Sequence, residues 1–375
     1  MKITHIITDL DVGGAERMLD RLLNHSSYSK NQIQIISLKN KGYLHDSLLA
    51  EGYNVSGMGF RAGSFSISGF YDLKKRIKDF GPNVIQTWMY HADFLGGLAA
   101  KSLGIPVIWN IRQTTLKKGI HKNSTRHLAK ICAYLSSNIP VKIVTCAHSA
   151  VDWHTKLGYD ASKFIVIPNG VDTDEFKLKT SDRSRIREEF GLNEDDIIVG
   201  TAARFSLSKG YDVLIKAIEN IVSSSENIKF IFCGNNIEPQ NEQLWGWIIK
   251  QNLKDKISLL GTRSDMPAIY SAMDILVSPS LAEGLSNTII EAMSCSLPCV
   301  VTDVGDSALI VRDTGLIIPP GDVGAITKSI LELAQDKAQR KKLGREARKK
   351  ILNEYSIQEI VRQYEDVYKK ILIPE

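Results

Sequence analysis

Short apolar runs alternate along the chain with longer amphipathic stretches. The runs are rich in β-branched residues, which favours strands, and the apolar positions between them recur at helical spacing. Strands are expected at 3–8, 33–38, 84–88, 107–111 and 143–146, and again at 197–202, 229–233, 257–260, 275–278 and 299–302. Strands that alternate with helices form parallel sheets covered by helices. The pattern therefore predicts an α/β protein.

The pattern breaks once, at the turn Pro168-Asn169-Gly170, which ends a further expected strand that starts at Ile165. Pro, Asn and Gly together favour a turn, and the alternation of strands and helices restarts after it. A chain of 375 residues is also long enough for about two domains. We expect two Rossmann-like domains, 1–170 and 171–355, that face each other across a cleft.

The last stretch predicts one further helix, within 356–375. Its apolar positions fall at helical spacing, at Ile357, Ile360, Val361, Tyr364, Val367, Tyr368 and Ile371. Because such a helix must bury its apolar face, we expect it to pack back on the N-terminal domain.

The composition is that of an ordinary globular protein, with 43% hydrophobic and 24% charged residues and a mean hydropathy of −0.11. No apolar stretch reaches the roughly 18 residues needed to span a membrane, and the N-terminus lacks the pattern of a signal peptide, so a cytoplasmic location is expected. The five cysteines lie in apolar runs without the paired spacing of a zinc site, which predicts buried thiols.

The net charge of +5 is unevenly distributed. Residues 1–180 hold 23 Lys and Arg against 14 Asp and Glu, whereas residues 181–375 hold 24 against 28. Between Asp93 and Asp152 there is no acidic residue. A basic run is often only a solvated helix face. Because acids are completely lacking here, an anionic partner is an equally good explanation of this run. The cations in this stretch are Lys101, Arg112, Lys117, Lys118, Lys122, Arg126, Lys130 and Lys142.

The segment 280–293 carries the strongest candidate chemistry. It follows an expected strand and opens a helix near Ser286, with seven residues between Glu283 and Glu291. A strand-to-helix turn of this kind presents backbone N–H groups and the positive end of the helix dipole to phosphate. A carboxylate accepts two hydrogen bonds at once, which suits the hydroxyls of a sugar or a ribose. Taken alone, the two glutamates could equally be solvated surface charges.

Two cations follow another expected strand. Arg204 and Lys209 lie in the loop after 197–202, and a helical pattern begins after Gly210. At the carboxyl end of a strand, two cations can neutralise a diphosphate without a metal. At about 4 Å and an effective dielectric constant near 20, each charge pair contributes roughly 4 kcal/mol. Together with the two glutamates, these cations indicate a nucleotide-sugar site.

The order and spacing of these motifs resemble the retaining GT-B glycosyltransferases of family 4. The resemblance rests on the two glutamates, on Arg204 with Lys209-Gly210 and on the turn at 167–172, and it covers nearly the whole chain. Residues 9–17 are similar to the family's first strand-to-helix loop, in which glycines such as Gly14 let the backbone approach the donor diphosphate. The resemblance implies a GT-B fold and a glycosyltransferase that needs no cofactor.

The resemblance also implies roles for individual residues. Arg204 and Lys209 would bind the diphosphate, Glu291 the ribose and Glu283 the transferred sugar, and the loop around Arg263 would border the base. The cradle for sugar and phosphate would be completed by backbone groups of Gly284, Leu285, Ser286 and Asn287.

One position departs from the family pattern. The strand at 106–112 often ends in a histidine in the family, whereas this chain has Arg112, which could contact an anion together with Lys117 and Lys118. His91 follows the preceding strand and would face the expected cleft. It is therefore the histidine we consider for catalysis, although a histidine in such a place is more often structural.

The family is thought to retain configuration by reaction on one face of the sugar, where the leaving diphosphate helps to deprotonate the acceptor. The protein then supplies positioning and charge stabilisation, and no side-chain nucleophile is expected. Asp9 and Asp11 form an Asp-x-Asp pattern, which holds a metal in another glycosyltransferase fold. Here the pattern lies in the wrong domain for that role, so no catalytic metal is expected.

The basic stretch 94–151 mixes its cations with apolar residues, which suits an anionic membrane surface and a lipid pyrophosphate. We expect a peripheral enzyme at the inner face of the cytoplasmic membrane that extends a saccharide linked to a lipid pyrophosphate, as in O-antigen or capsule synthesis. UDP is the expected carrier of the donor sugar, with GDP as the alternative. Nucleic acid is not an expected partner.

Two other functions fit the same motifs. A GT-B-like sugar-nucleotide epimerase would share the two domains but need no acceptor, so an epimer formed from nucleotide sugar alone would favour it. A catalytically silent sugar-nucleotide-binding protein would show no turnover. A dinucleotide dehydrogenase is disfavoured, because no Gly-x-Gly-x-x-Gly follows the first strand.

Overall fold

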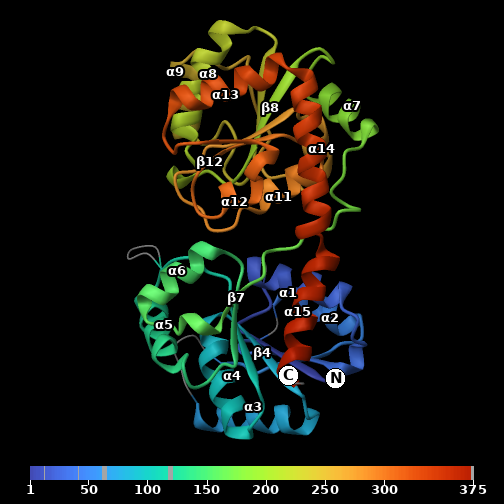
Figure 1. The fold of residues 1–375 in the computed structure, drawn as a ribbon, viewed down its shortest axis with the longest axis vertical. Coiled ribbons are helices and arrows are strands. Elements are labelled where there is room, and N and C mark those ends of the chain that lie inside the picture. Colours follow the sequence, from blue (N-terminus) through green and yellow to red (C-terminus); the bar gives the residue numbers. More distant parts are fainter. Residues whose placement is uncertain (12, 41, 61–65, 117–120, 373–375) are drawn as a thin grey trace. The chain divides into compact units, whose positions relative to one another are not determined.

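The structure, a computed structural model, describes residues 1–11, 13–40, 42–60, 66–116 and 121–372. The chain forms two compact units (Figure 1): the first contains Met1–Gly170 and the chain from Ile357 onward, and the second contains Val171–Ser356. Each unit has a parallel sheet of its own, as the alternation of strands and helices predicts.

In the part of the first unit that the structure describes, seven strands form the sheet, in the order β3-β2-β1-β4-β5-β6-β7. The strands are β1 (Ile3–Ile7), β2 (Ile33–Ser37), β3 (Asn54–Gly57), β4 (Val84–Trp88), β5 (Val107–Ile111), β6 (Lys142–Thr145) and β7 (Phe164–Val166). The helices between them are α1 (Gly14–His25), α2 (Tyr43–Ala50), α3 (Ile67–Phe80), α4 (Met89–Leu103), α5 (Asn123–Leu135) and α6 (His148–Leu157).

The second unit has a six-stranded sheet, in the order β10-β9-β8-β11-β12-β13. Its strands are β8 (Ile197–Ala202), β9 (Ile228–Cys233), β10 (Ile257–Leu259), β11 (Ile275–Ser278), β12 (Cys299–Thr302) and β13 (Leu316–Ile318). Its helices are α7 (Thr180–Glu189), α8 (Tyr211–Ser224), α9 (Glu242–Lys250), α10 (Met266–Ala272), α11 (Asn287–Ser294), α12 (Ser307–Val311), α13 (Val323–Gln335) and α14 (Lys337–Glu354).

Both faces of each sheet are buried. In the first unit, alternate strand residues enter two separate cores, with Ile7 and Ile35 beside α1 on one face and Ile6 and Ile36 beside α3 and α4 on the other. A strand that is buried on both faces has no side that faces solvent, which explains why the strands are mainly apolar without strict alternation. All five cysteines are buried and none forms a disulfide, as expected from their apolar surroundings: Cys132, Cys146, Cys233, Cys295 and Cys299.

The helix α15 (Ile357–Leu372) belongs to the first unit, where it lies beside α1 (Figure 1). Tyr364 and Tyr368 enter the core, and the ring of Tyr364 stacks on Trp88 with centroids 6.3 Å apart. A Cβ atom at Gly170 would lie 2.8 Å from the Cα of Ile357. Glycine at position 170 therefore permits this close approach of the helix, in addition to forming a turn.

The order of the strands reverses once in each sheet, between β1 and β4 and between β8 and β11. At such a switch point the connections on the two sides leave in opposite directions, so the carboxyl ends of the strands border a crevice that commonly binds ligands. The loops after β8 and β11 contain Arg204, Lys209 and Glu283. The topology thus places the strongest motifs of the sequence on both sides of one switch point.

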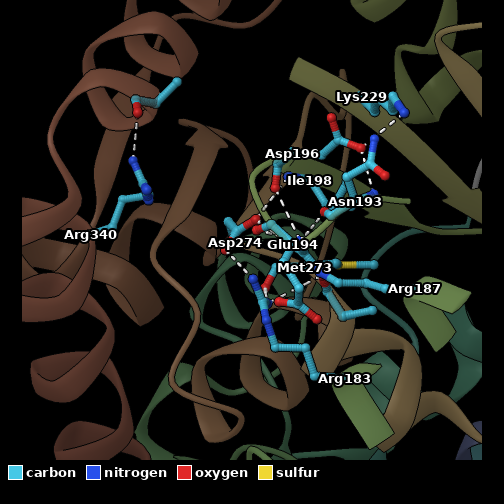
Figure 2. A network of polar contacts seen from close by, with 12 residues as sticks. Arg183, Arg187, Asn193, Glu194, Asp196, Ile198, Lys229, Met273, Asp274 and Arg340 are labelled. Atoms are coloured by element: carbon cyan, nitrogen blue, oxygen red, sulfur yellow. Dashed lines mark hydrogen bonds and ion pairs between the residues drawn. The ribbon is translucent and has the colours of Figure 1, made fainter. Parts of the chain in front are cut away.

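A partly buried ion network lies at the opposite, amino end of the same strands (Figure 2). Asp274 precedes β11, and its Oδ2 atom accepts hydrogen bonds from Nη2 of Arg187 at 2.7 Å and from the backbone N–H of Ile198 at 2.8 Å. Its Oδ1 atom accepts from Nη2 of Arg183 at 2.8 Å. Both arginines belong to α7, so one carboxylate joins this helix to the start of the sheet.

Asp93, on α4, is a fully buried carboxyl group in the first unit. Its Oδ1 atom lies 2.5 Å from Oγ1 of Thr87, and burial raises its pKa to about 7. Oγ1 of Thr87 is also 3.3 Å from the carbonyl oxygen of Ile108. A protonated Asp93 can donate to Thr87, which then donates to Ile108, so the neutral carboxyl group satisfies both contacts.

We expect the Asp93→Asn variant to differ from the wild type in the pH dependence of its stability. Between about pH 4 and pH 7 the folded protein keeps a proton that an unfolded aspartate releases, so the wild type loses stability as the pH rises. The variant lacks this loss, so its free energy of unfolding relative to that of the wild type should increase by up to about 4 kcal/mol between pH 4 and 8. Urea unfolding at several pH values measures this difference. The exposed Asp79→Asn is the control, and parallel curves for Asp93→Asn and wild type would contradict the expectation.

Candidate active site

The loop after β8 is fixed against the loop after β11. Gly210 has a φ of +69°, and a Cβ atom there would lie 2.0 Å from the carbonyl oxygen of Pro279. The backbone N–H of Leu281 donates to the carbonyl oxygen of Ser208 at 2.8 Å. Only glycine combines this backbone conformation with this close approach. The Lys-Gly pair of the sequence motif therefore positions Lys209 beside the β11 loop.

Lys209 and Glu283 are in direct contact. Nζ of Lys209 donates to Oε1 of Glu283, and Oγ of Ser280 donates to the same oxygen at 2.8 Å. The Lys209 and Glu283 side chains are 21% and 10% exposed, so the pair is only partly screened by solvent. The structure thus brings two of the predicted residues together and adds Ser280, to which the sequence alone gave no role.

The loop after β12 fixes the backbone around Glu283. The backbone N–H of Asp306 donates to the carbonyl oxygen of Gly284 at 2.9 Å. Gly305 has a φ of +56°, and a Cβ atom there would lie 2.5 Å from the carbonyl oxygen of Glu283. Oγ1 of Thr302 donates to the carbonyl oxygen of Ser280 at 2.6 Å. These contacts come from a part of the chain that carries no recognisable motif, so the sequence analysis missed them.

The helix α11 starts at the predicted place, with Ser286 as its N-cap residue. The Ser286 side chain accepts no hydrogen bond from the first turn of the helix. Thr288, in that turn, donates through Oγ1 to the carbonyl oxygen of Ala202 at 2.7 Å. The start of the helix is therefore tied to the end of β8, where its dipole favours an anion.

Glu291 lies further along α11, and the phenol of Tyr270 on α10 orients its carboxylate. The Tyr270 hydroxyl donates to Oε2 of Glu291 at 3.0 Å. Tyr270 is 1% exposed, and its burial together with the charge of Glu291 raises the pKa of the phenol well above its usual range. The phenol therefore stays protonated and keeps its role as donor. Sequence reasoning gave no signal for Tyr270.

The two other predicted cations of the second unit differ in their surroundings. Arg204 is exposed, in the loop after β8. Arg263 instead donates to Glu189 at 2.7 Å and to Asp265 at 2.9 Å, and its guanidinium lies over the ring of Phe190 at 5.8 Å. Two carboxylates neutralise its charge and fix the loop against α7. Any contact of this loop with a nucleotide would therefore rely on its backbone more than on the Arg263 charge.

In the first unit, the loop after β1 contains the predicted Gly14. A Cβ atom at Gly13 would lie 2.2 Å from Oε2 of Glu16, whereas a Cβ atom at Gly14 would meet nothing within 4 Å. The neighbour at position 13 is the end of a flexible side chain that can move, so packing requires glycine at neither position. Asp9, at the start of the loop, accepts from Nζ of Lys39 at 2.7 Å.

His91 lies in the first turn of α4. This helix directly follows β4, which is one of the two strands at the switch point of the first sheet. The chain passes from β4 to α4 through Met89, which has a φ of +72°. An L-residue in this left-handed region is strained by about 1 kcal/mol or more, and such strain is concentrated at functional sites. Burial, with the nearby Lys39 and Lys122, lowers the pKa of His91. The imidazole is therefore neutral at pH 7.

Arg112 follows β5 and contacts α15. Its Nη1 atom donates to the hydroxyl of Tyr364 at 3.1 Å, and Asn110 donates to the same oxygen at 3.1 Å. Nη2 of Arg112 is buried without a hydrogen-bond partner among the residues that the structure describes. The two cations predicted to act with it, Lys117 and Lys118, lie outside the described residues.

Two known protein families together match most of the chain. Residues 12–175 match the family described as Glycosyltransferase Family 4, and residues 182–350 match the family described as Glycosyl transferases group 1. The chain belongs to the family 4 glycosyltransferases. The resemblance seen in the sequence motifs is thereby confirmed.

Several curated relatives of this glycosyltransferase act in the biosynthesis of bacterial capsule or lipopolysaccharide. An α-1,3-galactosyltransferase of Escherichia coli, which transfers from UDP-Gal to α-D-GlcNAc-diphosphoundecaprenol, is 24% identical, with 82% of this chain and 80% of the relative covered. The capsular polysaccharide biosynthesis glycosyltransferase CapM of Staphylococcus aureus is 26% identical, with 82% of this chain and 83% of the relative covered. These relatives support a role of the same class for this protein.

Solved structures confirm the fold. HepE of Anabaena in complex with UDP superimposes with a TM-score of 0.85 at 19% identity, with 99% of this chain and 100% of that chain covered. The glycosyltransferase WaaG, which is involved in lipopolysaccharide biosynthesis, gives a TM-score of 0.71 at 14% identity, with 98% and 99% covered. This glycosyltransferase has the GT-B fold.

Proposed function

We propose that this protein is a retaining glycosyltransferase that moves a sugar from a UDP-sugar to a hydroxyl group of a lipid-linked saccharide. The observation that carries the proposal is the contact between Lys209 and Glu283 at the switch point of the second sheet. It joins a cation suited to a diphosphate with a carboxylate suited to a sugar hydroxyl. The complex of HepE with UDP and the use of UDP-Gal by the Escherichia coli relative support the choice of carrier.

The proposed donor site uses the residues predicted from the sequence. Arg204 and Lys209 bind the diphosphate, Glu291 binds the ribose and Glu283 binds the transferred sugar. The base borders the loop around Arg263. Backbone groups of 284–287 complete the contacts to sugar and phosphate.

The proposed reaction keeps the configuration at the sugar. The bond between C1 of the sugar and the diphosphate oxygen breaks, and the bond from C1 to the acceptor oxygen forms on the same face. The acceptor proton passes to the departing diphosphate oxygen, and no metal takes part in the proposed step. Lys209 and Arg204 stabilise the charge that develops on the diphosphate. His91, neutral at pH 7, can accept a hydrogen bond from a sugar or acceptor hydroxyl.

The Glu291→Ala variant tests the donor site. Loss of a charged hydrogen bond to the ribose should weaken UDP binding by roughly 1.5–3 kcal/mol, which is between about tenfold and about a hundredfold. Calorimetric titration with UDP measures the change, and the exposed Glu242→Ala serves as control. Unchanged UDP affinity would refute the ribose role.

A thermal-shift screen of UDP- and GDP-sugars identifies the donor, because preferential binding raises the stability of the folded protein.

The proposed acceptor surface lies on α5. His127, Lys130, Ile131 and Tyr134 recur at helical spacing and are all exposed, with Ile131 at 47% and Tyr134 at 82%. A cation beside exposed aliphatic and aromatic side chains is typical of a helix that lies on a membrane surface. Among the described helices, none is both long and apolar enough to cross a membrane. We therefore place the enzyme at an anionic membrane surface, where a lipid-pyrophosphate acceptor is held.

Neutralising this helix face should weaken membrane binding. The double variant Lys130→Gln with Tyr134→Ser should bind anionic liposomes at low salt at least about tenfold more weakly than the wild type. Sedimentation with liposomes of anionic and of neutral lipid measures it. Lys341→Gln with Leu352→Ser, a matched pair of exposed residues on α14, is the control. If the wild type fails to bind anionic liposomes, the membrane proposal loses its support.

A further inference from the structure

The Glu283 carboxylate has two unequal oxygens. Oε1 accepts from both Nζ of Lys209 and Oγ of Ser280, whereas Oε2 has no hydrogen-bond partner among the residues that the structure describes. Ser280 is 2% exposed, and Thr302 holds its backbone carbonyl group. The two donors therefore fix the carboxylate in one orientation, with Oε2 as the atom that can accept from a substrate hydroxyl.

The Lys209 ammonium serves two anions at once. One of its N–H groups donates to Glu283, and an ammonium has three such donors. Under the proposed function, another donates to the diphosphate. The diphosphate and the Glu283 carboxylate then share one cation and repel each other. Because both side chains are largely buried, this repulsion is only partly screened.

A nucleotide sugar compensates the repulsion, and a nucleoside diphosphate does not. The sugar brings hydroxyl groups that can donate to Oε2. Once the sugar has been transferred, this donor is gone, and the freed terminal phosphate carries about one further negative charge at neutral pH, as phosphate monoesters do. The same carboxylate thus faces a favourable partner before the transfer and an unfavourable one after it.

We propose that Glu283 discriminates against the nucleoside diphosphate product, and that Ser280 is the positioning residue that holds Oε2 toward the sugar. The proposal rests on the proposed function, because it takes the donor diphosphate to bind at Lys209. Glu283 then recognises the donor sugar and also promotes release of the product. Its charge matters for release, and its geometry, set by Ser280, matters for donor binding.

The test compares UDP with UDP-glucose, UDP-galactose and UDP-N-acetylglucosamine by calorimetric titration. The Glu283→Gln variant keeps the shape of the side chain and removes its charge. We expect it to bind UDP about tenfold more tightly than the wild type, with the best UDP-sugar bound no more tightly than by the wild type. Glu291→Gln is the matched control, because the ribose is common to both ligands and both affinities should fall together.

The Ser280→Ala variant separates orientation from charge. The carboxylate stays ionised and paired with Lys209, so UDP affinity should stay within about twofold of the wild type, whereas affinity for the best UDP-sugar should fall several-fold. In kinetics, the KM for the donor should rise more than kcat falls. Equal losses for UDP and the UDP-sugar would show that Ser280 only supports the fold, and would overturn its positioning role.

The outcomes distinguish this proposal from the proposed function. If the wild type binds a UDP-sugar and transfers its sugar, but Glu283→Gln binds UDP no more tightly than the wild type, the discrimination proposal is wrong and the proposed function stands. If the wild type binds neither UDP nor any of the UDP-sugars, the proposed donor is wrong and the discrimination proposal falls with it.

Discussion

Replacement of Lys209 by methionine is expected to lower kcat by roughly a hundredfold to a thousandfold, as removal of a single charge-stabilising donor does in other enzymes. Lys209 is held at the end of β8 by Gly210 and by the contact with Glu283, so its ammonium is fixed before the reaction begins. The charge on the departing diphosphate grows as the bond to the sugar breaks. A fixed cation stabilises this transition state more than it stabilises the bound donor.

Steady-state kinetics with saturating donor and acceptor measure the effect, and thermal unfolding shows whether the variant is folded. Lys216→Met, at an exposed position on the following helix α8, is the matched control and should keep wild-type turnover. An effect of Lys209→Met that is confined to the KM of the acceptor would contradict the proposed role, because the leaving group would then not depend on this cation.

Replacement of Asp274 by alanine is expected to destabilise the second unit by about 3–5 kcal/mol. The substitution leaves the guanidinium of Arg187, which is 1% exposed, without its carboxylate (Figure 2). Arg183 and the backbone N–H of Ile198 lose the same partner. A buried charge that has lost its counterion costs far more than the net contribution of the intact pair, because it remains desolvated.

Urea unfolding measured by circular dichroism gives the free energy of unfolding. The control is Asp255→Ala, an exposed aspartate in the turn before β10, which should change stability by less than about 0.5 kcal/mol. The Asp274 network lies at the amino end of β8 and β11, away from the loops that follow these strands. Folded Asp274→Ala protein should therefore keep its donor affinity. A loss of activity without a loss of stability would contradict the structural role.

Most of the fold could be predicted from the sequence, because strands in doubly covered parallel sheets are mainly apolar runs. The ten strands expected in the two alternating patterns are present, and so is the strand expected before the turn at Pro168, with ends that agree to within about one residue. The strands β3 and β13 were missed. Both lie at the edge of a sheet, where one side has no neighbouring strand, and both are short and partly exposed. β3 lacks the apolar run that marks a central strand, and the apolar run of β13 is only three residues long.

The candidate site was only partly predictable. Glu283, Glu291 and Lys209 belong to local motifs, so the sequence indicated them. Tyr270 and Gly305 act through contacts that join separate βα units, and neither lies in a motif. Such contacts depend on which strands are neighbours in the sheet, and a single sequence does not show strand order. The neutralisation of Arg263 by Glu189 likewise depends on the packing of α7 against the loop after β10.

The place of α15 in the first unit has a consequence for how the protein is made. The second unit, Val171–Ser356, is continuous in the chain, whereas the core of the first unit includes Tyr364 and Tyr368 from the end of the chain. During synthesis, domains generally fold in the order in which they leave the ribosome. Here the unit that emerges first cannot close its core until the later one is complete. The N-terminal unit therefore completes its fold only after α15 has been synthesised. Until then, the apolar face that α15 covers is exposed to chaperones.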